Sequence, residues 1–407
     1  MSKFIINGNR ALSGTVEVSG SKNAALPLIF ATIITHGVSL IRQVPDISDV
    51  DVAIGLISSL GAKVNRIQGD LLIDTTDLCY TRPAEYLVSK IRASSYLLGA
   101  NLARFGICHV QSFGGCNFDN RPIDMHINAM KTLGAVEKGD AFVSKRLIGS
   151  DIVFDKISVG ATVNALLLTC TAKGKSRIFG YAKEPHVIAL VDFLRSGGAC
   201  ITLYDDRIEV EGRELSGMSA SVIPDMIEAG TYTAMSLLGN CDIKVSGILP
   251  NHLASFFEIL KANGAFVSFD GNSAKVSGEL CNFTNIVTGP YPEFPTDLQP
   301  QMAPLLSSFC GGRITEKVWK GRFGYLSELE KFGVNYEICD SSAIIFPSKL
   351  HSATAKAPDL RGGAAILMCA LFSKGESIVN SAEIIKRGYS DILNKLRLLG
   401  ADIEEVV

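Results

Sequence analysis

One sequence phrase recurs six times along the chain and strongly limits the folds that are open to it. In each copy an amphipathic segment ends in a glycine and a strand-like run follows, as in LISSLGAKV, AMKTLGAVE and ILKANGAFV. The glycines of this first series are Gly61, Gly134, Gly198, Gly264, Gly333 and Gly400. One copy therefore takes about 68 of the 407 residues, and such a period indicates a repeated supersecondary module.

A second phrase adds another helix to each module. It is an apolar, Ala/Leu-rich run that ends at the glycines of a second series, Gly37, Gly106, Gly174, Gly239, Gly311 and Gly375. Glycine suits the position after a helix because a left-handed conformation there costs it no Cβ clash. Segment 365–371 of this kind is apolar all round and is expected to be buried. The first kind of helix has one apolar face instead, formed for example by Leu253, Phe256, Phe257 and Leu260.

Strands that alternate with two helices per module predict an α/β fold in which sheets cover buried helices. Six modules in one chain favour two globules of three modules each. An open solenoid of six stacked modules is the alternative. It is disfavoured because the loops between modules are long and carry the unusual polar residues.

Charge and cysteine content exclude several classes of function. The chain has 39 Lys+Arg and 41 Asp+Glu, so it lacks the global basic surface that binds nucleic acid or anionic lipid nonspecifically. Ten cysteines are scattered without a CxxC pair, which indicates a reducing compartment. The start resembles no signal peptide, and the most apolar window, 24–41, is broken by Pro27 and Gly37. A cytoplasmic protein without a membrane span is expected.

Four loops carry polar residues that packing does not require, and the first of them opens a helix. Lys22 and Asn23 precede the apolar segment 24–34. Backbone N–H groups at a helix start, with a lysine beside them, favour a phosphate or carboxylate. A simple helix cap with a solvated lysine explains the same residues equally well.

The second loop holds the one cysteine that lies outside an apolar run. Cys116 follows two glycines and precedes Arg121, close to the start of a helix predicted at 123–133. A neighbouring cation and a helix N-terminus favour the thiolate, which makes the residue a usable acid or nucleophile. An idle loop cysteine is the alternative.

The third loop and a late group of arginines complete the candidate site. Loop 291–297 holds Asp297 behind two stiffening prolines, as suits a general base, although an aspartate that caps the next helix fits equally well. Arg322, Arg361 and Arg387 carry guanidinium forks that match carboxylate and phosphate oxygens, with scattered surface arginines as the alternative. If equivalent loops of the modules converge, these residues suit a small substrate that carries both phosphate and carboxylate.

These residues resemble the enolpyruvyltransferase family over nearly the whole chain. The matching motifs are GSKNAALP at 20–27, IRASSYLLG at 91–99, GGC at 114–116, RPIDMHI at 121–127, SVGAT at 158–162, YPEFPTD at 291–297, DLR at 359–361 and RGY at 387–389. GGC and RPIDMHI are unlike the branch that makes 5-enolpyruvylshikimate 3-phosphate. The resemblance therefore favours the branch that acts on a sugar nucleotide.

The resemblance implies an inside-out α/β barrel of two domains, each built from three βαβαββ repeats with helices inside and sheet outside. It implies one lobe of residues 1–21 and 225–407, another of residues 22–224, and a cleft between them. The implied reaction moves the enolpyruvyl group of phosphoenolpyruvate to the 3-hydroxyl of UDP-N-acetylglucosamine through a tetrahedral ketal and releases phosphate. This is the first committed step of peptidoglycan synthesis, and it implies a monomer with no metal and no cofactor.

The resemblance also carries roles over to individual residues. Phosphoenolpyruvate would be bound by Lys22, Arg121, Arg322, Arg361 and Arg387. The sugar nucleotide would be held by Asn23, Arg92, Arg121, Pro122, Ile123, Asp124, Met125, Lys156, Ile157, Ser158, Val159, Asp297 and Val318. Asp297 would take the proton of the attacking hydroxyl, with Asp359 as the other candidate base. Cys116 would protonate the methylene carbon or form a covalent phospholactoyl adduct.

Three positions depart from the family pattern and leave the acceptor open. Met226 stands where arginine is common, His186 where a second acidic residue is common, and Lys320 where glutamate is common. One alternative is a paralogue that enolpyruvylates a UMP-type nucleotide. Another is a catalytically silent module that senses sugar nucleotide, although the presence of Cys116 and Asp297 speaks against it.

Overall fold

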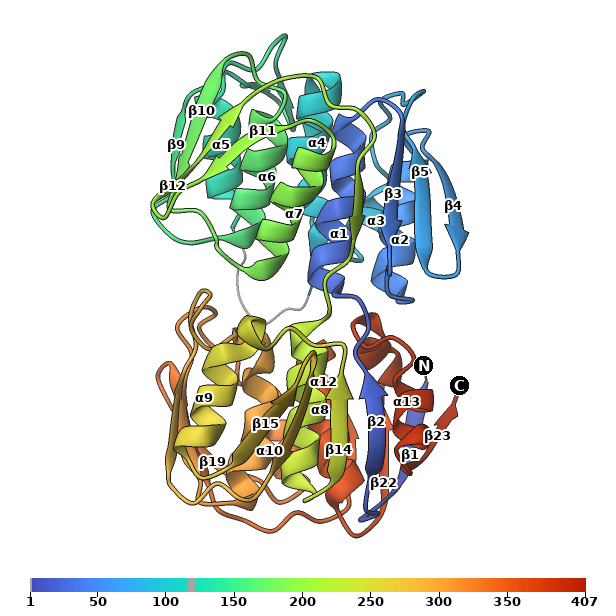
Figure 1. The fold of residues 1–407 in the computed structure, drawn as a ribbon, viewed down its shortest axis with the longest axis vertical. Helices are drawn as coiled ribbons and strands as arrows, with labels where there is room; N and C mark the ends of the chain where they lie inside the picture. Colours follow the sequence, from blue (N-terminus) through green and yellow to red (C-terminus); the bar gives the residue numbers. More distant parts are fainter. Residues whose placement is uncertain (1, 116–121) are drawn as a thin grey trace. The chain divides into compact units, whose positions relative to one another are not determined.

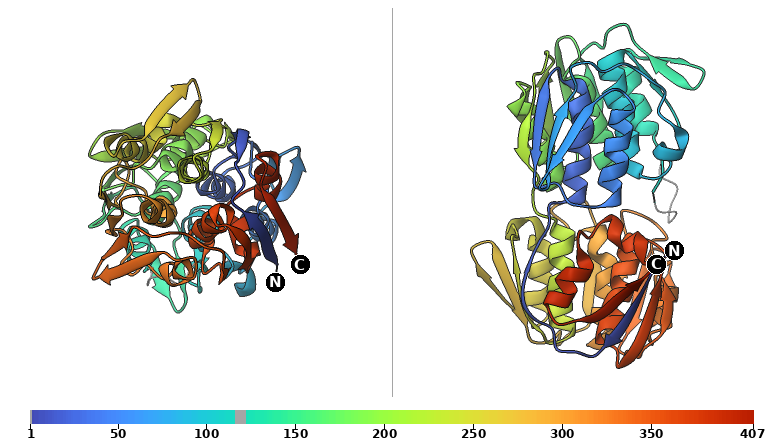
Figure 2. Two further views of the ribbon diagram at one scale, coloured as in Figure 1. Left: turned by 90° about the horizontal axis from the view of Figure 1, so that it is seen from below. Right: turned by 90° about the vertical axis from the view of Figure 1, so that its right-hand side faces the viewer.

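The computed structural model describes residues 2–115 and 122–407, and Figure 1 traces the chain. The described residues form two compact units. The C-terminal unit comprises residues 2–19 and 224–407, and the N-terminal unit comprises residues 20–115 and 122–223. The described strands of each unit form three small sheets, and within each unit the longer helices run alongside one another with strands on the outside (Figures 1 and 2).

The N-terminal unit is built around three helices whose middle residues are buried: α1 (Lys22–Ala31), α4 (Tyr96–Phe105) and α6 (Val159–Thr169). Its sheets have the strand orders β13-β3-β5-β4, β6-β8-β7 and β11-β12-β10-β9. The strands are β3 (Val38–Arg42), β4 (Lys63–Ile67), β5 (Asp70–Asp74), β6 (Ile107–His109), β7 (Val136–Lys138), β8 (Ala141–Val143), β9 (Asp151–Val153), β10 (Lys175–Phe179), β11 (Cys200–Leu203), β12 (Arg207–Glu211) and β13 (Ser219–Ser221). The remaining helical segments are η1 (Thr32–Ile34), α2 (Ser48–Ser58), α3 (Glu85–Val88), η2 (Arg92–Ser95), α5 (Asp124–Thr132) and α7 (Pro185–Ser196).

The C-terminal unit repeats this plan around α8 (Met226–Leu238), α10 (Gln299–Ser308) and α12 (Leu360–Phe372). Its sheets have the orders β15-β16-β14-β2, β17-β18-β20-β19 and β21-β22-β1-β23. The strands are β1 (Lys3–Gly8), β2 (Ser13–Glu17), β14 (Asp242–Ser246), β15 (Phe266–Asp270), β16 (Ser273–Ser277), β17 (Thr284–Val287), β18 (Gly312–Thr315), β19 (Asn335–Cys339), β20 (Ser342–Phe346), β21 (Thr354–Lys356), β22 (Gly375–Asn380) and β23 (Asp402–Val406). The remaining helical segments are η3 (Pro250–Leu253), α9 (Ala254–Ala262), η4 (Thr296–Leu298), α11 (Leu326–Glu330), η5 (Ala382–Arg387) and α13 (Ile392–Leu398).

Five of the six sheets in the described part of the chain have four strands and share one topology, and the β6-β8-β7 sheet has three strands. In the order β17-α10-β18-α11-β19-β20, the first two strands are parallel and β20 lies between β18 and β19. The order β9-α6-β10-α7-β11-β12 repeats the same pairing in the N-terminal unit. The predicted α/β class and the module with two helices are confirmed. The described strands form separate sheets and not one closed barrel.

The start of the chain completes two sheets of the C-terminal unit. Strand β1 is antiparallel to both β22 and β23, and β2 is parallel to β14. In the N-terminal unit, β13 is in turn parallel to β3, although about 180 residues separate them in the sequence. These long-range pairings tie the first and last strands of a unit into its sheets.

The helix-ending glycines have the predicted conformation with one exception. All six glycines of the first series have φ between 92° and 111°. In the second series Gly239 has φ −92°, and Asn240 takes the left-handed position with φ 46°. The prediction that Gly239 has a left-handed conformation is therefore wrong. Glycine is required there by packing, because a Cβ would lie 2.1 Å from the ring of Phe372.

The two kinds of helix are buried as predicted. In α12 every residue from Leu360 to Leu371 is buried. In α9 only Phe256, Phe257 and Leu260 are buried, and these three residues form one stripe of an otherwise accessible helix. The apolar all-round helices therefore form the centre of each unit and the amphipathic helices its shell.

A buried ion pair anchors the N-terminal segment to α8 within the C-terminal unit. The side chain of Glu228 is only 1% exposed, and Nζ of Lys395 lies 2.6 Å from its Oε1. The same ammonium group donates to Oγ of Ser19 at 2.6 Å, and the Ser19 N–H donates to Oε2 of Glu228 at 2.9 Å. Burial raises the pKa of Glu228, and the charge of Lys395 opposes that shift.

Replacing Lys395 by methionine is expected to lower the free energy of unfolding by about 3–5 kcal/mol, because the Glu228 carboxylate stays buried without its cation. Urea unfolding followed by circular dichroism measures the loss. The double variant Glu228→Gln/Lys395→Met should recover much of it, since no charge is then buried alone. A single variant as stable as the wild type would show that the pair contributes little.

Candidate active site

In the C-terminal unit, Asp297 lies between two nearly buried arginines. Its Oδ1 is 2.9 Å from Nη1 of Arg322, and its Oδ2 is 3.3 Å from Nε and Nη2 of Arg361. The arginine side chains are 5% and 2% exposed, whereas the Asp297 side chain is 31% exposed. Scattered surface arginines are thus excluded as an explanation of these two residues. The cluster leaves one side of the carboxylate accessible.

Local structure explains why these three side chains meet. Asp297 lies in η4, directly before α10, and Arg361 lies in the first turn of α12, which packs against α10. Arg322 follows β18. Asp297 does not cap α10, because the residue at the N-cap is Leu298 and makes no side-chain bond. The capping alternative for Asp297 is therefore not supported.

Asp359, the other candidate base, caps a helix. It is the N-cap of α12, where its Oδ1 accepts hydrogen bonds from the backbone N–H groups of Arg361 and Gly362, each at 2.9 Å. A carboxylate in this position stabilises the helix start. It also orients the first turn, which carries the Arg361 side chain.

Arg361 is held charged in a buried setting. Burial alone would lower the pKa of Arg361, but Tyr389 and the carboxylates of Asp297 and Asp225 outweigh it and raise the pKa. The guanidinium carbon lies 5.4 Å from the centre of the Tyr389 ring. The Tyr389 hydroxyl is itself 2.9 Å from Oγ1 of Thr231. Arg387 is half-buried at the end of η5, two residues before this tyrosine.

In the N-terminal unit, Lys22 is paired and not solvated. Its Nζ lies 2.9 Å from Oδ2 of Asp49, with side-chain exposures of 14% and 5%. Ser21 is the N-cap of α1 but makes no side-chain capping bond. Both parts of the helix-cap alternative therefore fail. Sequence reasoning missed Asp49, although an acidic residue on the buried stripe of α2, with Ala53 and Leu56, was a usable signal.

Further predicted substrate residues gather at the starts of α5 and α6, which pack together. Asp124 and Met125 open α5, after Pro122 and Ile123. Ser158 caps α6 by accepting a hydrogen bond from the N–H of Ala161 at 3.3 Å, with Val159 next to it. The preceding residues are Lys156 and Ile157, the latter 50% exposed. The other predicted residues lie at the second position of α1 (Asn23), at the start of η2 (Arg92) and in the loop after β18 (Val318).

Two predicted residues, Cys116 and Arg121, lie outside the described residues. The structure therefore brings together Asp297, Arg322 and Arg361 in one unit. In the other unit it brings together the starts of α5 and α6.

His126 is a buried polar residue that sequence reasoning did not single out, although it lies within RPIDMHI. It is 3% exposed, and its Nδ1 has no hydrogen-bond partner among the described residues. The pKa of His126 is lowered to about 4, chiefly by burial and also by the charge of Arg92, while the charge of Asp124 opposes the shift. A Cβ on Gly160 would lie 2.9 Å from its Nε2, so glycine is needed there.

This histidine predicts a pH dependence of stability. Its pKa falls from 6.5 to about 4 on folding, so the neutral form stabilises the fold fully above pH 6.5. As the pH drops from 6.5 towards 4, the unfolded chain binds the proton first and about 3 kcal/mol is lost. Urea titrations of wild type and His126→Leu across this range should give a difference that changes with pH. The matched change His351→Leu, at an exposed histidine, should not alter the slope, and parallel wild-type and His126→Leu curves would contradict the assignment.

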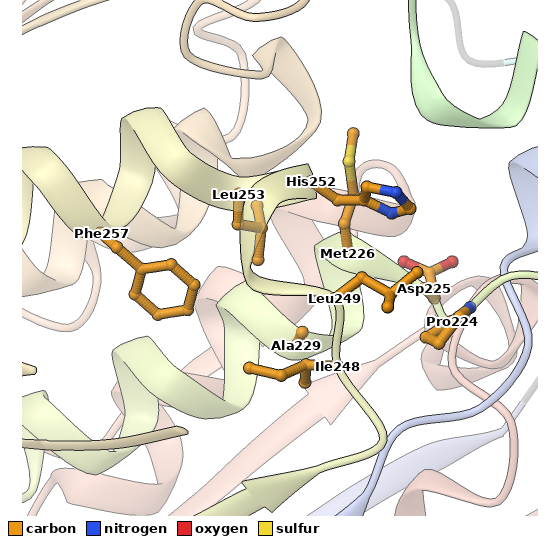
Figure 3. Close-up of a pocket in the computed structure, with 9 residues that line it drawn as sticks. All are labelled: Pro224, Asp225, Met226, Ala229, Ile248, Leu249, His252, Leu253 and Phe257. Atoms are coloured by element: carbon orange, nitrogen blue, oxygen red, sulfur yellow. The ribbon is translucent and has the colours of Figure 1, made fainter. Parts of the chain in front are cut away.

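An apolar pocket lies beside the start of α8 (Figure 3). Met226 and His252 lie at one side of it in this view and Phe257 at the other. Asp225 caps α8 with bonds from the N–H groups of Ile227 and Glu228 at 2.8 and 3.0 Å. Met226, one of the positions that depart from the family pattern, thus lines a pocket that contains none of the predicted substrate residues.

Over the described residues, no group of three or more His, Cys, Asp or Glu is placed to hold a metal ion. Within the same part of the chain, no helix is both long enough and apolar enough to cross a bilayer.

Comparison with known proteins identifies the family. The family model described as EPSP synthase (3-phosphoshikimate 1-carboxyvinyltransferase) matches residues 6–396. The chain is 41% identical to the UDP-N-acetylglucosamine 1-carboxyvinyltransferase of Clostridium botulinum, with 99% of both chains covered. It is 39% identical to the protein of the same name from Halothermothrix orenii, with 100% of both covered.

Solved structures agree. The enolpyruvyl transferase NikO from Streptomyces tendae matches with a TM-score of 0.89 at 25% identity, covering 100% of this chain and 99% of that one. EPSP synthase from Acinetobacter baumannii shares the fold at 16% identity, with a TM-score of 0.73 and 100% of both chains covered. The resemblance to the enolpyruvyltransferases is confirmed, and the chain belongs to the EPSP synthase (3-phosphoshikimate 1-carboxyvinyltransferase) family.

Proposed function

We propose that the chain transfers the enolpyruvyl group of phosphoenolpyruvate to the 3-hydroxyl of UDP-N-acetylglucosamine and releases phosphate, as a UDP-N-acetylglucosamine 1-carboxyvinyltransferase. The observation that carries the proposal is the Asp297 carboxylate between the buried guanidinium groups of Arg322 and Arg361. Relatives of that name, 38–41% identical over nearly their whole length, support the choice of acceptor.

In the addition step, Asp297 takes the proton of the attacking hydroxyl, and the oxygen bonds to the central carbon of the enol. Two neighbouring guanidinium groups keep a carboxylate ionised, which is the form that accepts a proton. Cys116 gives its proton to the methylene carbon, which becomes a methyl group. In the elimination step this methyl group returns a proton to the enzyme, the C–O bond to phosphate breaks and the vinyl ether forms.

The arginines bind the anionic groups of phosphoenolpyruvate. A guanidinium group has five N–H donors, and Asp297 occupies only two nitrogens of Arg361, so others can face a carboxylate or phosphate. Lys22, Arg121 and Arg387 add positive charge. A fixed array of donors stabilises charge that develops in the transition state without reorganising at that moment.

We assign the sugar nucleotide to the starts of α5 and α6. The first N–H groups of a helix have no intrahelical acceptor and favour a diphosphate. Asp124 and Met125 open one helix, while Ser158 and Val159 open the other. Arg92, at the start of η2, adds a cation in the same unit.

The proposal also includes the domain bounds, the architecture, the cellular location and the oligomeric state. We take residues 1–21 and 225–407 as one lobe, residues 22–224 as the other, and the two as an inside-out α/β barrel. We place the protein in the cytoplasm, as a monomer that acts in peptidoglycan synthesis without a cofactor.

The proposal is tested by phosphate release from phosphoenolpyruvate with UDP-N-acetylglucosamine, with UMP and without acceptor. Among these three conditions, phosphate release is expected only when UDP-N-acetylglucosamine is the acceptor. Turnover with UMP only would assign a paralogous activity and contradict the proposed acceptor. Binding of UDP-N-acetylglucosamine without consumption of phosphoenolpyruvate under any condition would indicate a silent binding module.

Cys116 gives a separate prediction. The epoxide fosfomycin should alkylate its sulfur, because a thiolate beside cations attacks a strained ring that carries a phosphonate. Peptide mapping by mass spectrometry locates the adduct. Cys116→Asp retains an acid at this position and is expected to keep some turnover while resisting the drug. Modification of another cysteine, such as the exposed Cys200, would refute the assignment.

A further inference from the structure

A second carboxylate, Glu316, is buried in the C-terminal unit and accepts a hydrogen bond from Thr296, the residue before Asp297. It is 1% exposed and directly follows β18. Its Oε1 accepts hydrogen bonds from Oγ1 of Thr288 at 2.6 Å, from the N–H of Val318 at 2.8 Å and from the N–H of Trp319 at 3.0 Å. Its Oε2 accepts from Oγ1 of Thr296 at 2.8 Å.

These bonds join three separate segments of the C-terminal unit. Thr288 follows β17, Thr296 opens η4, and residues 317–319 form the loop after β18. The N–H of Lys317 adds a bond to the Thr288 hydroxyl at 3.0 Å. Burying a carboxylate is costly unless its oxygens are hydrogen-bonded, and here four donors meet that need. The geometry of all three segments therefore depends on this one side chain.

The Thr296 hydroxyl links Glu316 to the candidate base. It donates to Oε2 of Glu316 and accepts from Nη1 of Arg322 at 2.9 Å. The same Nη1 lies 2.9 Å from Oδ1 of Asp297. Because the hydroxyl proton points to Glu316, the oxygen lone pairs face the arginine. The Glu316 carboxylate thereby sets the direction in which the guanidinium group meets Asp297.

We propose that Glu316 is a positioning residue: it orients the Arg322–Asp297 pair through Thr296 and fixes the loop that carries Val318. The effect on turnover rests on the proposed function. The effect on the loop does not, and it can be measured without any substrate because Trp319 is the only tryptophan of the chain.

Glu316→Gln is the sharpest variant. Its amide oxygen can still accept the bonds now made to Oε1, whereas its amide nitrogen cannot accept from the Thr296 hydroxyl. With charge-assisted bonds lost, kcat should fall roughly 10- to 100-fold, while KM for the sugar nucleotide changes much less. The acid limb of the pH profile of kcat/KM should move to higher pH, since Arg322 holds the ionised form of Asp297 less well.

The loop is followed through Trp319. In Thr288→Val, which removes the bond to Oε1 of Glu316 and the acceptor of the Lys317 N–H, the fluorescence emission should shift to the red and acrylamide should quench it more efficiently than in the wild type. Glu316→Gln keeps an acceptor for the N–H groups of Val318 and Trp319, so its emission should shift less. Thr284→Val is the matched control. Like Thr288, Thr284 is fully buried, but it lies at the first position of β17 and its hydroxyl donates to the carbonyl of Asn282 and not to Glu316. It should leave emission, quenching and the pH profile unchanged.

The outcomes separate the two proposals. A wild type that consumes no phosphoenolpyruvate contradicts the proposed function, and the Trp319 signal then still tests the positioning role. Glu316→Gln with the wild-type pH profile, together with Thr288→Val with the wild-type emission and quenching, overturns that role. If Glu316→Gln does not fold, Thr296→Val replaces it, because it removes the hydroxyl between Glu316 and Arg322. A displaced pH profile in Thr296→Val supports the role, and an unchanged one overturns it.

Discussion

Asp297→Asn is expected to lower kcat roughly a thousandfold, because a positioned general base contributes about 10² to 10⁴ and an amide cannot take the proton. The side chain keeps its shape, and its amide oxygen can still accept a bond from Arg322 or Arg361. Binding of UDP-N-acetylglucosamine, measured by calorimetry, should therefore change little. Steady-state phosphate release at saturating substrates gives kcat.

Asp359→Asn is the matched comparison, since it makes the same chemical change in the other candidate base. Asparagine caps helices about as well as aspartate, so α12 should remain in place. We expect a loss of kcat of less than roughly tenfold. If Asp359→Asn proves the more damaging of the two, the base is Asp359, and the role given to Asp297 is wrong.

Arg361→Met should lower kcat/KM for phosphoenolpyruvate by roughly a hundredfold or more. A charge-assisted hydrogen bond contributes about 1.5–3 kcal/mol, and the variant loses contacts both to the substrate anion and to Asp297. Arg361→Lys keeps the charge without the planar fork and should recover only part of the loss. Initial rates at varied phosphoenolpyruvate and saturating acceptor measure these effects.

Arg313→Met controls for the loss of a positive charge in the same unit. Arg313 is an exposed residue of β18, near in sequence to Arg322. It should retain wild-type kinetics. Equal losses in Arg361→Met and Arg313→Met would mean that general electrostatics, and not a specific contact, supports binding.

The periodicity of the sequence was sufficient to predict the α/β class and to distinguish the fully buried helices from the helices with one apolar face. It works because burial of one face or of all faces is a local property of the sequence, as α9 and α12 show. The glycine rule held for the whole first series for the same reason. It failed at Gly239, where packing against the Phe372 ring and not backbone conformation explains the glycine.

The contacts between residues that are far apart in the sequence could not be predicted from the periodicity of apolar residues or of the repeats. Glu228 and Lys395 are 167 residues apart, and neither stands out from the solvated charges around it in the sequence. Glu316 likewise becomes visible only when its partners are in place, whereas Asp49 could have been noticed as an acidic residue on the apolar stripe of α2. Local sequence left a helix cap as an equal alternative for Asp297 and surface arginines as the alternative for Arg322 and Arg361. The cluster was predicted only by the expected convergence of equivalent loops and by the resemblance.

The most direct test is to identify the product by nuclear magnetic resonance after incubation of the protein with phosphoenolpyruvate and UDP-N-acetylglucosamine. Enolpyruvyl transfer predicts an intact nucleotide sugar with a vinyl ether on the oxygen of carbon 3, and one free phosphate per ether formed. An ether at another hydroxyl, pyruvate with phosphate but no ether, or an unchanged nucleotide sugar would contradict the assignment.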